Sequence, residues 1–269
     1  MNATGDTTML TVDGLRVRVV HTRPQGIDDP AKVLVLHGWG ASIDAVGSIL
    51  AGLRDRVELA AVDLPGMGES EMVPSAWGNR DYAAFVVKLL DALGFDRFAL
   101  VGHSRGAAIS LVLASDPATQ GRVERMVLTG AAGIKPRRPA SYYVKVGSAK
   151  AGRVIGAVGG RPGKALQQKI RGKAASADWL AAPEELRGTL RNVLAEDLSP
   201  LLPQVAVPTL LIWGPDDDAT PLWMGEQMER EIPGAALIVL RSGGHFAYAE
   251  LAGEFNVIAG HFLTQGGRR

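Results

Sequence analysis

The segment FALVGHSRGA, Phe98 to Ala107, is the most informative part of the sequence. A continuous apolar run leads into Gly102, Ser104 stands between two glycines, and the run AAISLVLAS that follows is helix-like. Unbroken apolar character is typical of a strand buried on both faces, as in a parallel sheet. We therefore predict a buried strand that turns sharply through Ser104 into a helix. Gly102 and Gly106 would let neighbouring backbone pass without a clash with a Cβ atom.

Other apolar runs along the chain predict the remaining buried strands of the same sheet. They are KVLVLHG (32–38), VELAAVDLPG (57–66), VERMVLTG (123–130), PTLLIWG (208–214) and AALIVLRSGG (235–244). Helical periodicity separates several of them and is clearest over residues 79–94, where Gly94 follows the last turn. Alternating strands and helices predict an α/β protein with a doubly wound, mostly parallel sheet.

Two segments depart from this alternation. Residues 8–24 are expected to form an antiparallel hairpin around Asp13-Gly14. Residues 134–200 contain no clear strand, and we interpret them as a helical cap inserted into a core formed by residues 1–133 and 201–269. Within the cap, a helix that begins behind Pro183 should bury one apolar face. The residues of that face are Leu186, Leu190, Val193 and Leu194.

Composition excludes several classes of protein. The chain has 269 residues, a formal net charge of +1 and no cysteine. It therefore lacks the overall basic field of nucleic-acid-binding proteins, and it can form no disulfide. The first residues do not resemble a secretory leader, and no run approaches the roughly 18 apolar residues of a membrane helix. We expect a soluble cytoplasmic protein without nucleic-acid partners; the oligomeric state is left open.

Ser104 in a sharp strand-to-helix turn is a candidate nucleophile, and a serine needs a base to activate it. We choose His245, which follows the last buried strand and two glycines, where a loop can reach over the carboxyl edge of the sheet. The other histidines are expected to be packed, solvated, part of a turn or directed elsewhere. They are His21, His37, His103 and His261.

An acid must orient the base, and it should lie at the same edge of the sheet. No Asp or Glu occurs between Arg125 and Ala177, so the loop after the strand at 123–130 cannot supply it. WGPDDDATP (213–221) supplies three aspartates just beyond the next strand. We choose Asp217 and expect its two acidic neighbours to be solvated. The chain order is then serine, aspartate, histidine.

Five motifs, in order and with appropriate spacing, resemble those of the α/β-hydrolase superfamily, and the resemblance covers nearly all of the chain outside the predicted cap. They are HGWG (37–40), DLPGMGES (63–70), GHSRG (102–106), WGPDDDATP (213–221) and GGHFAYAE (243–250). The resemblance implies an oxyanion hole formed by the backbone N–H groups of Trp39 and Arg105. It also implies structural roles for Asp63 and Ser70, and it requires neither a metal nor a cofactor.

Residue types within these motifs favour ester chemistry. GHSRGA differs by one residue from the Gly-His-Asp-Arg-Gly-Ala of some dehalogenases and epoxide hydrolases, in which aspartate forms an ester with an alkyl group. Serine at that position would form a stable ether, so displacement at saturated carbon is disfavoured. We predict a carboxylesterase-type serine hydrolase that acts on a small-molecule acyl substrate.

Two alternatives stay open. The segment GHFAYAELAGEFNVIAGHFL (244–263) is similar to the C-terminal part of meta-cleavage product hydrolases, which cleave C–C bonds in vinylogous diketones. His103 and Phe246 depart from that family, which usually has Asn and Trp there. The other alternative is a ligand receptor that reuses the fold without catalysis.

Substrate selection is expected to depend on the cap. Between Ile134 and Ala174 the chain has eleven Lys or Arg residues and no acid. A solvated basic face is the simpler interpretation, and attraction of anionic substrates or of an anionic membrane surface is the other. The candidate substrate contacts are Tyr142, Tyr143, Trp179 and Phe246.

Overall fold

The computed structural model describes residues 6–135 and 181–265. The chain divides into two compact units, residues 1–134 with 184–269 and residues 135–183. The larger unit contains every element described below. Most of the predicted cap lies outside the described residues, so its boundaries stay a prediction.

The larger unit is built on one eight-stranded sheet in the order β1-β2-β4-β3-β5-β6-β7-β8. The strands are β1 (Asp6–Val12), β2 (Leu15–Thr22), β3 (Lys32–Leu36), β4 (Glu58–Val62), β5 (Phe98–His103), β6 (Val123–Thr129), β7 (Thr209–Trp213) and β8 (Ala236–Val239). β1 pairs with β2 and β2 with β4 in antiparallel fashion, and all other pairs are parallel. The predicted mostly parallel sheet with an N-terminal hairpin is confirmed.

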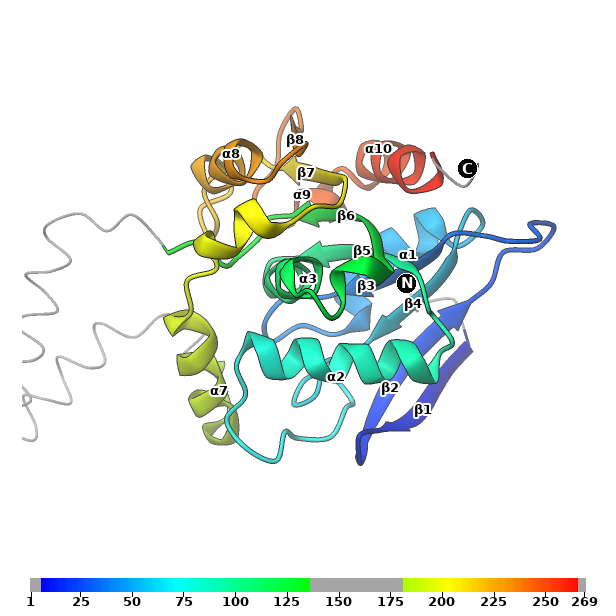
Figure 1. The fold of residues 1–269 in the computed structure, drawn as a ribbon, viewed down its shortest axis with the longest axis vertical. Helices are drawn as coiled ribbons and strands as arrows, with labels where there is room; N and C mark the ends of the chain where they lie inside the picture. Colours follow the sequence, from blue (N-terminus) through cyan, green and yellow to red (C-terminus); the bar gives the residue numbers. More distant parts are fainter. Residues whose placement is uncertain (1–5, 136–180, 266–269) are drawn as a thin grey trace, which may run out of the picture. The chain divides into compact units, whose positions relative to one another are not determined.

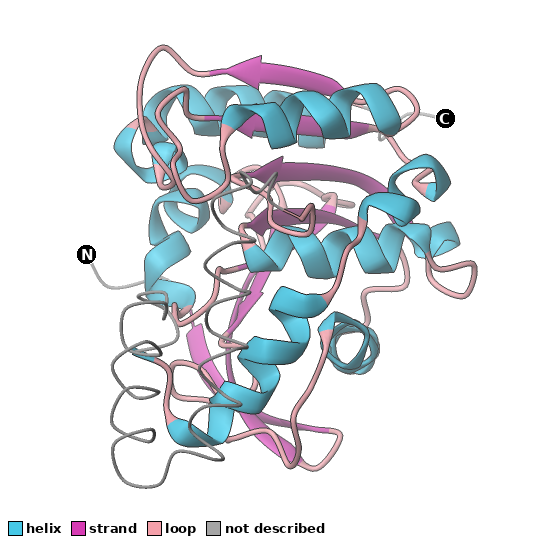
Figure 2. Ribbon diagram, turned by 90° about the vertical axis from the view of Figure 1, so that its left-hand side faces the viewer, coloured by secondary structure: helices cyan, strands magenta, loops and turns pink. Residues whose placement is uncertain are grey.

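Helices pack on both faces of this sheet (Figures 1 and 2). The α-helices are α1 (Gly47–Leu53), α2 (Asn79–Ala92), α3 (Arg105–Ser115), α7 (Glu184–Ala195), α8 (Leu222–Glu231), α9 (Ala247–Glu250) and α10 (Ala252–Thr264). Short 3-10 turns are η1 (Ile43–Val46), η2 (Gln120–Arg122) and η3 (Ser199–Gln204). One core lies beneath α2, α3 and α8, and the other lies beneath α1 and α10.

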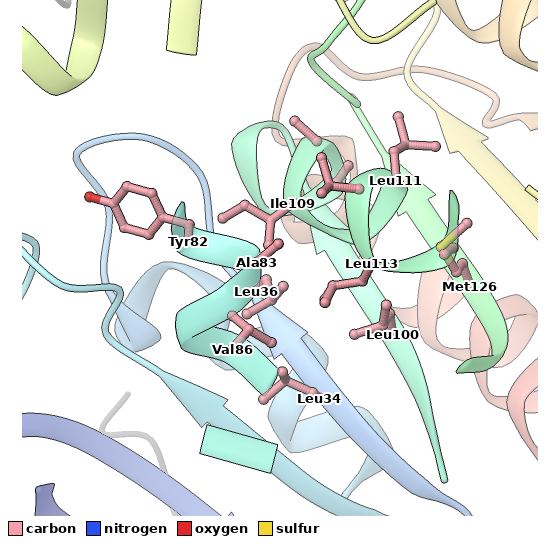
Figure 3. Packing of buried hydrophobic residues seen from close by; sticks show 14 of the residues in the cluster. Leu34, Leu36, Tyr82, Ala83, Val86, Leu100, Ile109, Leu111, Leu113 and Met126 are labelled. Carbon is pink, nitrogen blue, oxygen red and sulfur yellow. The ribbon is translucent and has the colours of Figure 1, made fainter. Parts of the chain in front are cut away.

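Alternating strand residues supply these two cores. Leu34 and Leu36 of β3 belong to the core beneath α2 and α3, whereas Val33 and Val35 belong to the core on the opposite face. Figure 3 shows Leu34 and Leu36 among side chains of α2 and α3. A strand buried on both faces has no polar alternation, which explains the continuous apolar runs in the sequence.

The N-terminal hairpin turns at Asp13 and Gly14, whose φ angles are 52° and 79°. Positive φ at both positions is typical of the two-residue turns that match the twist of a hairpin. In α7, Leu186 and Leu190 are buried as expected, but Leu194 is 60% exposed, so its predicted burial was wrong. Thr189 is buried instead, because residues 186, 189 and 190 lie on the same face of the helix. Its hydroxyl oxygen accepts a hydrogen bond from the Trp77 N–H at 3.1 Å.

Candidate active site

Ser104 lies at the sharp turn between β5 and α3, with φ 51° and ψ −111°. This is one of two non-glycine residues with positive φ in the described chain. A Cβ atom at Gly102 would lie 2.6 Å from the backbone of Ala107, and one at Gly106 would collide with the carbonyl oxygen of Leu36. Only glycine fits at either position, so the two glycines allow the tight turn that presents the serine.

Asp217 and His245 form a direct pair at the ends of the neighbouring strands. Nδ1 of His245 lies 2.9 Å from Oδ2 and 3.1 Å from Oδ1 of Asp217. Asp217 is 4% exposed, whereas Asp216 and Asp218 are exposed. The structure therefore separates the three consecutive aspartates by burial, and only the middle one faces the histidine.

Hydrogen bonds keep the Asp217 carboxylate ionised. Thr220 donates its backbone N–H to Oδ1 and its hydroxyl to Oδ2, each at 2.8 Å. Burial alone would raise the pKa of Asp217, but the hydrogen bonds from His245 and Thr220 outweigh it and lower the pKa below its usual value. A negative carboxylate at Nδ1 holds the proton on that nitrogen, so Nε2 is the nitrogen available to accept another proton.

The end of β6 lies between the serine and the Asp–His pair. The Ser104 N–H donates to the Thr129 carbonyl at 3.0 Å. A Cβ atom at the next residue, Gly130, would lie 3.1 Å from both Asp217 Oδ2 and His245 Nδ1. The three predicted residues therefore gather at one edge of the sheet. Among the described residues, no hydrogen bond joins the Ser104 hydroxyl to the His245 ring, so that contact stays a prediction.

The loop after β3 passes directly beside Ser104. A Cβ atom at Gly38 would lie 3.3 Å from the Cβ of Ser104. The buried His37 spans this loop, because its Nδ1 donates to the Gly38 carbonyl at 2.8 Å and its Nε2 accepts the Leu64 N–H at 3.0 Å. In a trans peptide the N–H points opposite to the C=O, so this bond directs the Trp39 N–H away from His37. Burial lowers the pKa of His37 and keeps it neutral.

A second backbone N–H near Ser104 belongs to Arg105. Arg105 is the first residue of α3, and the first N–H groups of a helix have no acceptor within the helix. They carry the positive end of the helix dipole. Gly38, the residue before Trp39, approaches Ser104, and Arg105 directly follows it; the oxyanion role of their N–H groups, those of Trp39 and Arg105, stays a prediction.

Asp63 and Ser70 cross-link the loops that surround the site. The Asp63 carboxylate accepts the Ile43 N–H at 2.6 Å and the Glu69 N–H at 2.9 Å, and the Ser70 hydroxyl donates to the Asp63 carbonyl at 2.6 Å. These bonds join the chain after β3 to the chain after β4. Such contacts between loops are consistent with the structural roles predicted for Asp63 and Ser70.

Comparison with known proteins agrees with this geometry. Residues 32–251 match the family described as alpha/beta hydrolase fold. That match spans most of the chain, including every motif from the loop after β3 to the histidine loop. The chain belongs to the alpha/beta hydrolase fold family.

Curated relatives of this alpha/beta hydrolase carry different names. The magnesium-chelatase 30 kDa subunit of Rhodobacter capsulatus is 30% identical over 86% of this chain and 84% of its own. The 2-hydroxy-6-oxo-6-phenylhexa-2,4-dienoate hydrolase of Comamonas testosteroni is 30% identical over 87% of each chain. A pimeloyl-[acyl-carrier protein] methyl ester esterase of Neisseria meningitidis is 27% identical over 89% of this chain and 95% of its own.

Solved structures share the fold. The enol-lactonase from Burkholderia xenovorans LB400 superposes with a TM-score of 0.72 at 23% identity, covering 96% of this chain and 100% of the other. Within residues 6–135 and 181–265, no helix combines the length and apolar character needed to cross a membrane. The same described residues contain no cluster of side chains suited to hold a metal ion.

His103 contacts the predicted base, which the sequence analysis did not anticipate. Its ring centroid lies 4.7 Å from that of His245, and its Nε2 lies 3.0 Å from the His245 carbonyl oxygen. Burial, followed by the nearby His245 ring, lowers the pKa of His103 to about 3, so this imidazole is neutral at physiological pH. Neutral His103 therefore donates from Nε2 and helps hold the histidine loop.

His103 should make the stability of the protein depend on pH. Its pKa falls from 6.5 to about 3 on folding, so between these values the unfolded chain holds the extra proton. The free energy of unfolding should therefore decrease as the pH falls, by up to about 1.4 kcal/mol per pH unit from this group. We expect His103→Asn, which keeps an N–H donor, to show a shallower slope in denaturant titrations between about pH 4 and 6.

A matched control for that experiment is His261→Asn, at an exposed histidine of α10. This variant also loses a histidine but keeps the contact between His103 and His245, so it shows how much of the change in slope comes from that contact. The buried His37 also contributes to the pH dependence, but it is present in both proteins and does not affect the comparison. An equal slope for His103→Asn and the unmodified protein would therefore contradict the prediction.

Other predicted site residues are placed differently. Phe246 is 49% exposed, and its ring centroid lies 5.4 Å from that of His245, so it lines the outer side of the histidine loop. Tyr142, Tyr143 and Trp179 lie outside the described residues, as does the basic segment. The sequence analysis also missed Thr220, whose hydroxyl binds Asp217. The spacing Asp-x-x-Thr within WGPDDDATP could have indicated this contact. An aspartate carboxylate can accept hydrogen bonds from groups a few residues further along the chain.

Proposed function

We propose that this alpha/beta hydrolase is a serine esterase of the carboxylesterase type, with Ser104 as nucleophile, His245 as general base and Asp217 as the acid that orients it. The observation that carries the proposal is the buried Asp217 carboxylate paired with His245 Nδ1 at the edge of the sheet where Ser104 is presented.

Each group has one task in the proposed reaction. His245 Nε2 takes the proton of Ser104 as the serine oxygen attacks the acyl carbon, and Asp217 stabilises the resulting imidazolium. The imidazolium then protonates the departing alcohol, which leaves an acyl-enzyme. Water attacks the acyl-enzyme with His245 again as base, and this step releases the acid and restores the serine.

Backbone dipoles would stabilise the negative oxygen of each tetrahedral intermediate. The proposed donors are the N–H groups of Trp39, which follows the Gly38 that lies next to Ser104, and of Arg105 at the start of α3, whose dipole would add to their effect. Loss of one such donor typically slows the reaction by about 10²- to 10³-fold, so this contribution is comparable to that of many general bases. His37, which fixes the peptide that carries the Trp39 N–H, would be a positioning residue in this reaction.

C–C bond hydrolysis is the second candidate. It is supported by the 30% identity to the 2-hydroxy-6-oxo-6-phenylhexa-2,4-dienoate hydrolase of Comamonas testosteroni. The ester proposal has comparable support from the Neisseria methyl ester esterase. We favour the ester because His103 and Phe246 replace the Asn and Trp usual in meta-cleavage product hydrolases.

A substrate panel distinguishes these candidates. We expect a fluorophosphonate to label Ser104 and the protein to turn over p-nitrophenyl esters within a series from acetate to palmitate. A vinylogous diketone is tested beside them under the same conditions. Faster cleavage of the diketone than of every ester would replace the ester proposal with the C–C proposal. Labelling without turnover of any acyl compound would indicate a receptor.

A further inference from the structure

The side chain of Arg105 is buried at the residue that follows Ser104, and among the described residues the Tyr82 hydroxyl is a polar neighbour of its guanidinium and interacts with it weakly. The residue is 4% exposed. No described residue accepts a hydrogen bond of normal geometry from Nε, Nη1 or Nη2. Buried charged groups are normally paired, so this guanidinium is an exception that needs a physical explanation.

Two aromatic rings enclose the guanidinium. Its carbon Cζ lies 4.0 Å from the ring centroid of Tyr82 and 4.9 Å from that of Trp39. Tyr82 belongs to α2 and donates its hydroxyl proton to the Pro65 carbonyl at 2.8 Å. Figure 3 shows the hydroxyl of Tyr82 directed away from the aliphatic side chains of the core. The guanidinium therefore lies at the border of the core, next to the loop that carries the Trp39 N–H.

Arg105 remains charged in this place. Burial lowers its pKa to about 10, which still leaves the group protonated at neutral pH. The electrostatic influence of Tyr82 and Glu196 and a weak side-chain hydrogen bond to Tyr82 favour the charged form. Both oxygens of Glu196 are occupied at the start of α2, where they accept the N–H of Asn79 at 3.1 Å and its side-chain amide at 2.9 Å. Glu196 influences the cation electrostatically, but among the described residues no hydrogen bond joins the two side chains.

Aromatic stacking does not satisfy this cation completely. Rings bind the faces of a guanidinium, whereas its five N–H donors point outward in its plane. Those donors match the two oxygens of a carboxylate. Trp39 is the half-buried member of the enclosure and Tyr82 is fully buried, so the side of the guanidinium covered by Trp39 is the one nearer to solvent.

We propose that Arg105 binds a carboxylate group of the substrate, so that the preferred substrates are acyl compounds carrying a second, free carboxylate. This inference rests on the proposed esterase function, because Arg105 directly follows Ser104 and an anion held there lies within the same site. Electrostatic attraction at that position favours anionic over neutral esters of equal size.

Two esters that differ only in charge test the inference. p-Nitrophenyl hydrogen glutarate carries a free carboxylate, and methyl p-nitrophenyl glutarate carries its neutral methyl ester. We expect the unmodified protein to prefer the acid in kcat/KM. Arg105→Met should lower the ratio of the two kcat/KM values by about 10- to 100-fold. Arg105→Lys should restore part of the preference, because it keeps the positive charge but cannot donate two parallel hydrogen bonds to a carboxylate.

The ratio of the two kcat/KM values separates the effect of the side-chain charge from other effects of the substitution. If the substitution disturbs the backbone N–H of residue 105, it slows the hydrolysis of both esters alike, and this effect cancels in the ratio. Arg97→Met, at an exposed arginine paired with Glu124, is the matched control and should leave the ratio unchanged. A ratio near one in the unmodified protein, or an equal ratio in Arg105→Met, overturns the inference and assigns the arginine a packing role.

A binding measurement separates this inference from the proposed function. Ser104→Ala keeps Arg105, and calorimetry with monomethyl glutarate and with dimethyl glutarate needs no turnover. We expect the monoacid to bind more tightly by about 10- to 100-fold. Equal affinities overturn the inference, even if Arg105→Met does not fold. Tight binding of the monoacid by a protein that hydrolyses no ester would contradict the function and keep the anion site.

Discussion

Ser104→Ala is expected to lower kcat for the best ester substrate by about 10⁶-fold, because the reaction loses its nucleophile while the oxyanion donors remain. The change removes a single oxygen atom from a half-buried residue, so the fold should persist. Steady-state kinetics with the best p-nitrophenyl ester measures the loss, and fluorophosphonate labelling should disappear with it.

Ser110→Ala is the matched control for this substitution. Ser110 lies on the same helix, α3, and its hydroxyl donates to the Gly106 carbonyl at 2.9 Å. Its hydroxyl bonds within the helix and is not a hydrogen-bond partner of Ser104, Asp217 or His245, so kcat should change little. Activity retained in Ser104→Ala, with the melting temperature of both variants near that of the unmodified protein, would show that another residue is the nucleophile.

Asp217→Asn is expected to lower kcat by about 10⁴-fold, because the amide cannot hold the proton on His245 Nδ1 as the carboxylate does. An amide that donates toward Nδ1 favours the wrong tautomer, in which Nε2 carries the proton and cannot act as a base. Asp218→Asn, at the exposed neighbour, is the control and should retain nearly full activity. Similar losses in the two variants would contradict the choice of Asp217.

The same variant has an expected effect on stability. The pKa of Asp217 is below its ordinary value of 3.8 in the folded protein, so its ionised form stabilises the fold at higher pH. That stabilisation is complete above pH 3.8 and is lost as the pH falls through the lowered pKa. Denaturant titrations should therefore show the difference between Asp217→Asn and the unmodified protein shrinking in acid.

The centre of the sheet could be predicted from the sequence because β3, β4, β5 and β7 are buried on both faces. Runs such as KVLVLHG and FALVGHS have no polar alternation, and each one corresponds to a strand, β3 and β5. The run at 235–244 does form a strand, β8, but its predicted burial was wrong, because β8 is the last strand of the sheet and its residues are exposed or half-buried. Leu194 shows where periodicity was insufficient. Leu186 and Leu194 are eight residues apart, which rotates them by about 80° around a helix with 3.6 residues per turn. Thr189, a polar residue, is buried instead because its hydroxyl finds the Trp77 N–H.

Site residues that lie in a local sequence motif could be predicted from the sequence. Those that are defined by contacts between distant parts of the chain could not. Asp217 was distinguishable from its neighbours by spacing, and the structure adds that it alone is buried. The contact of His103 with the His245 carbonyl joins positions 142 apart in the chain, and no local pattern signals it. The enclosure of the Arg105 guanidinium likewise depends on Tyr82 of α2 and on Trp39 in the loop after β3, which are distant from each other in the sequence.

The positive φ angle of Ser104 has a consequence for how this protein can evolve. A non-glycine residue in that region carries a conformational penalty of about 1–3 kcal/mol, which alanine would share and glycine would not. Ser104→Gly should therefore melt at a higher temperature than Ser104→Ala, as calorimetry can test. Selection for heat resistance alone would then favour glycine at this position, so a serine kept there against the preference of the backbone is what the proposed esterase function would lead one to expect.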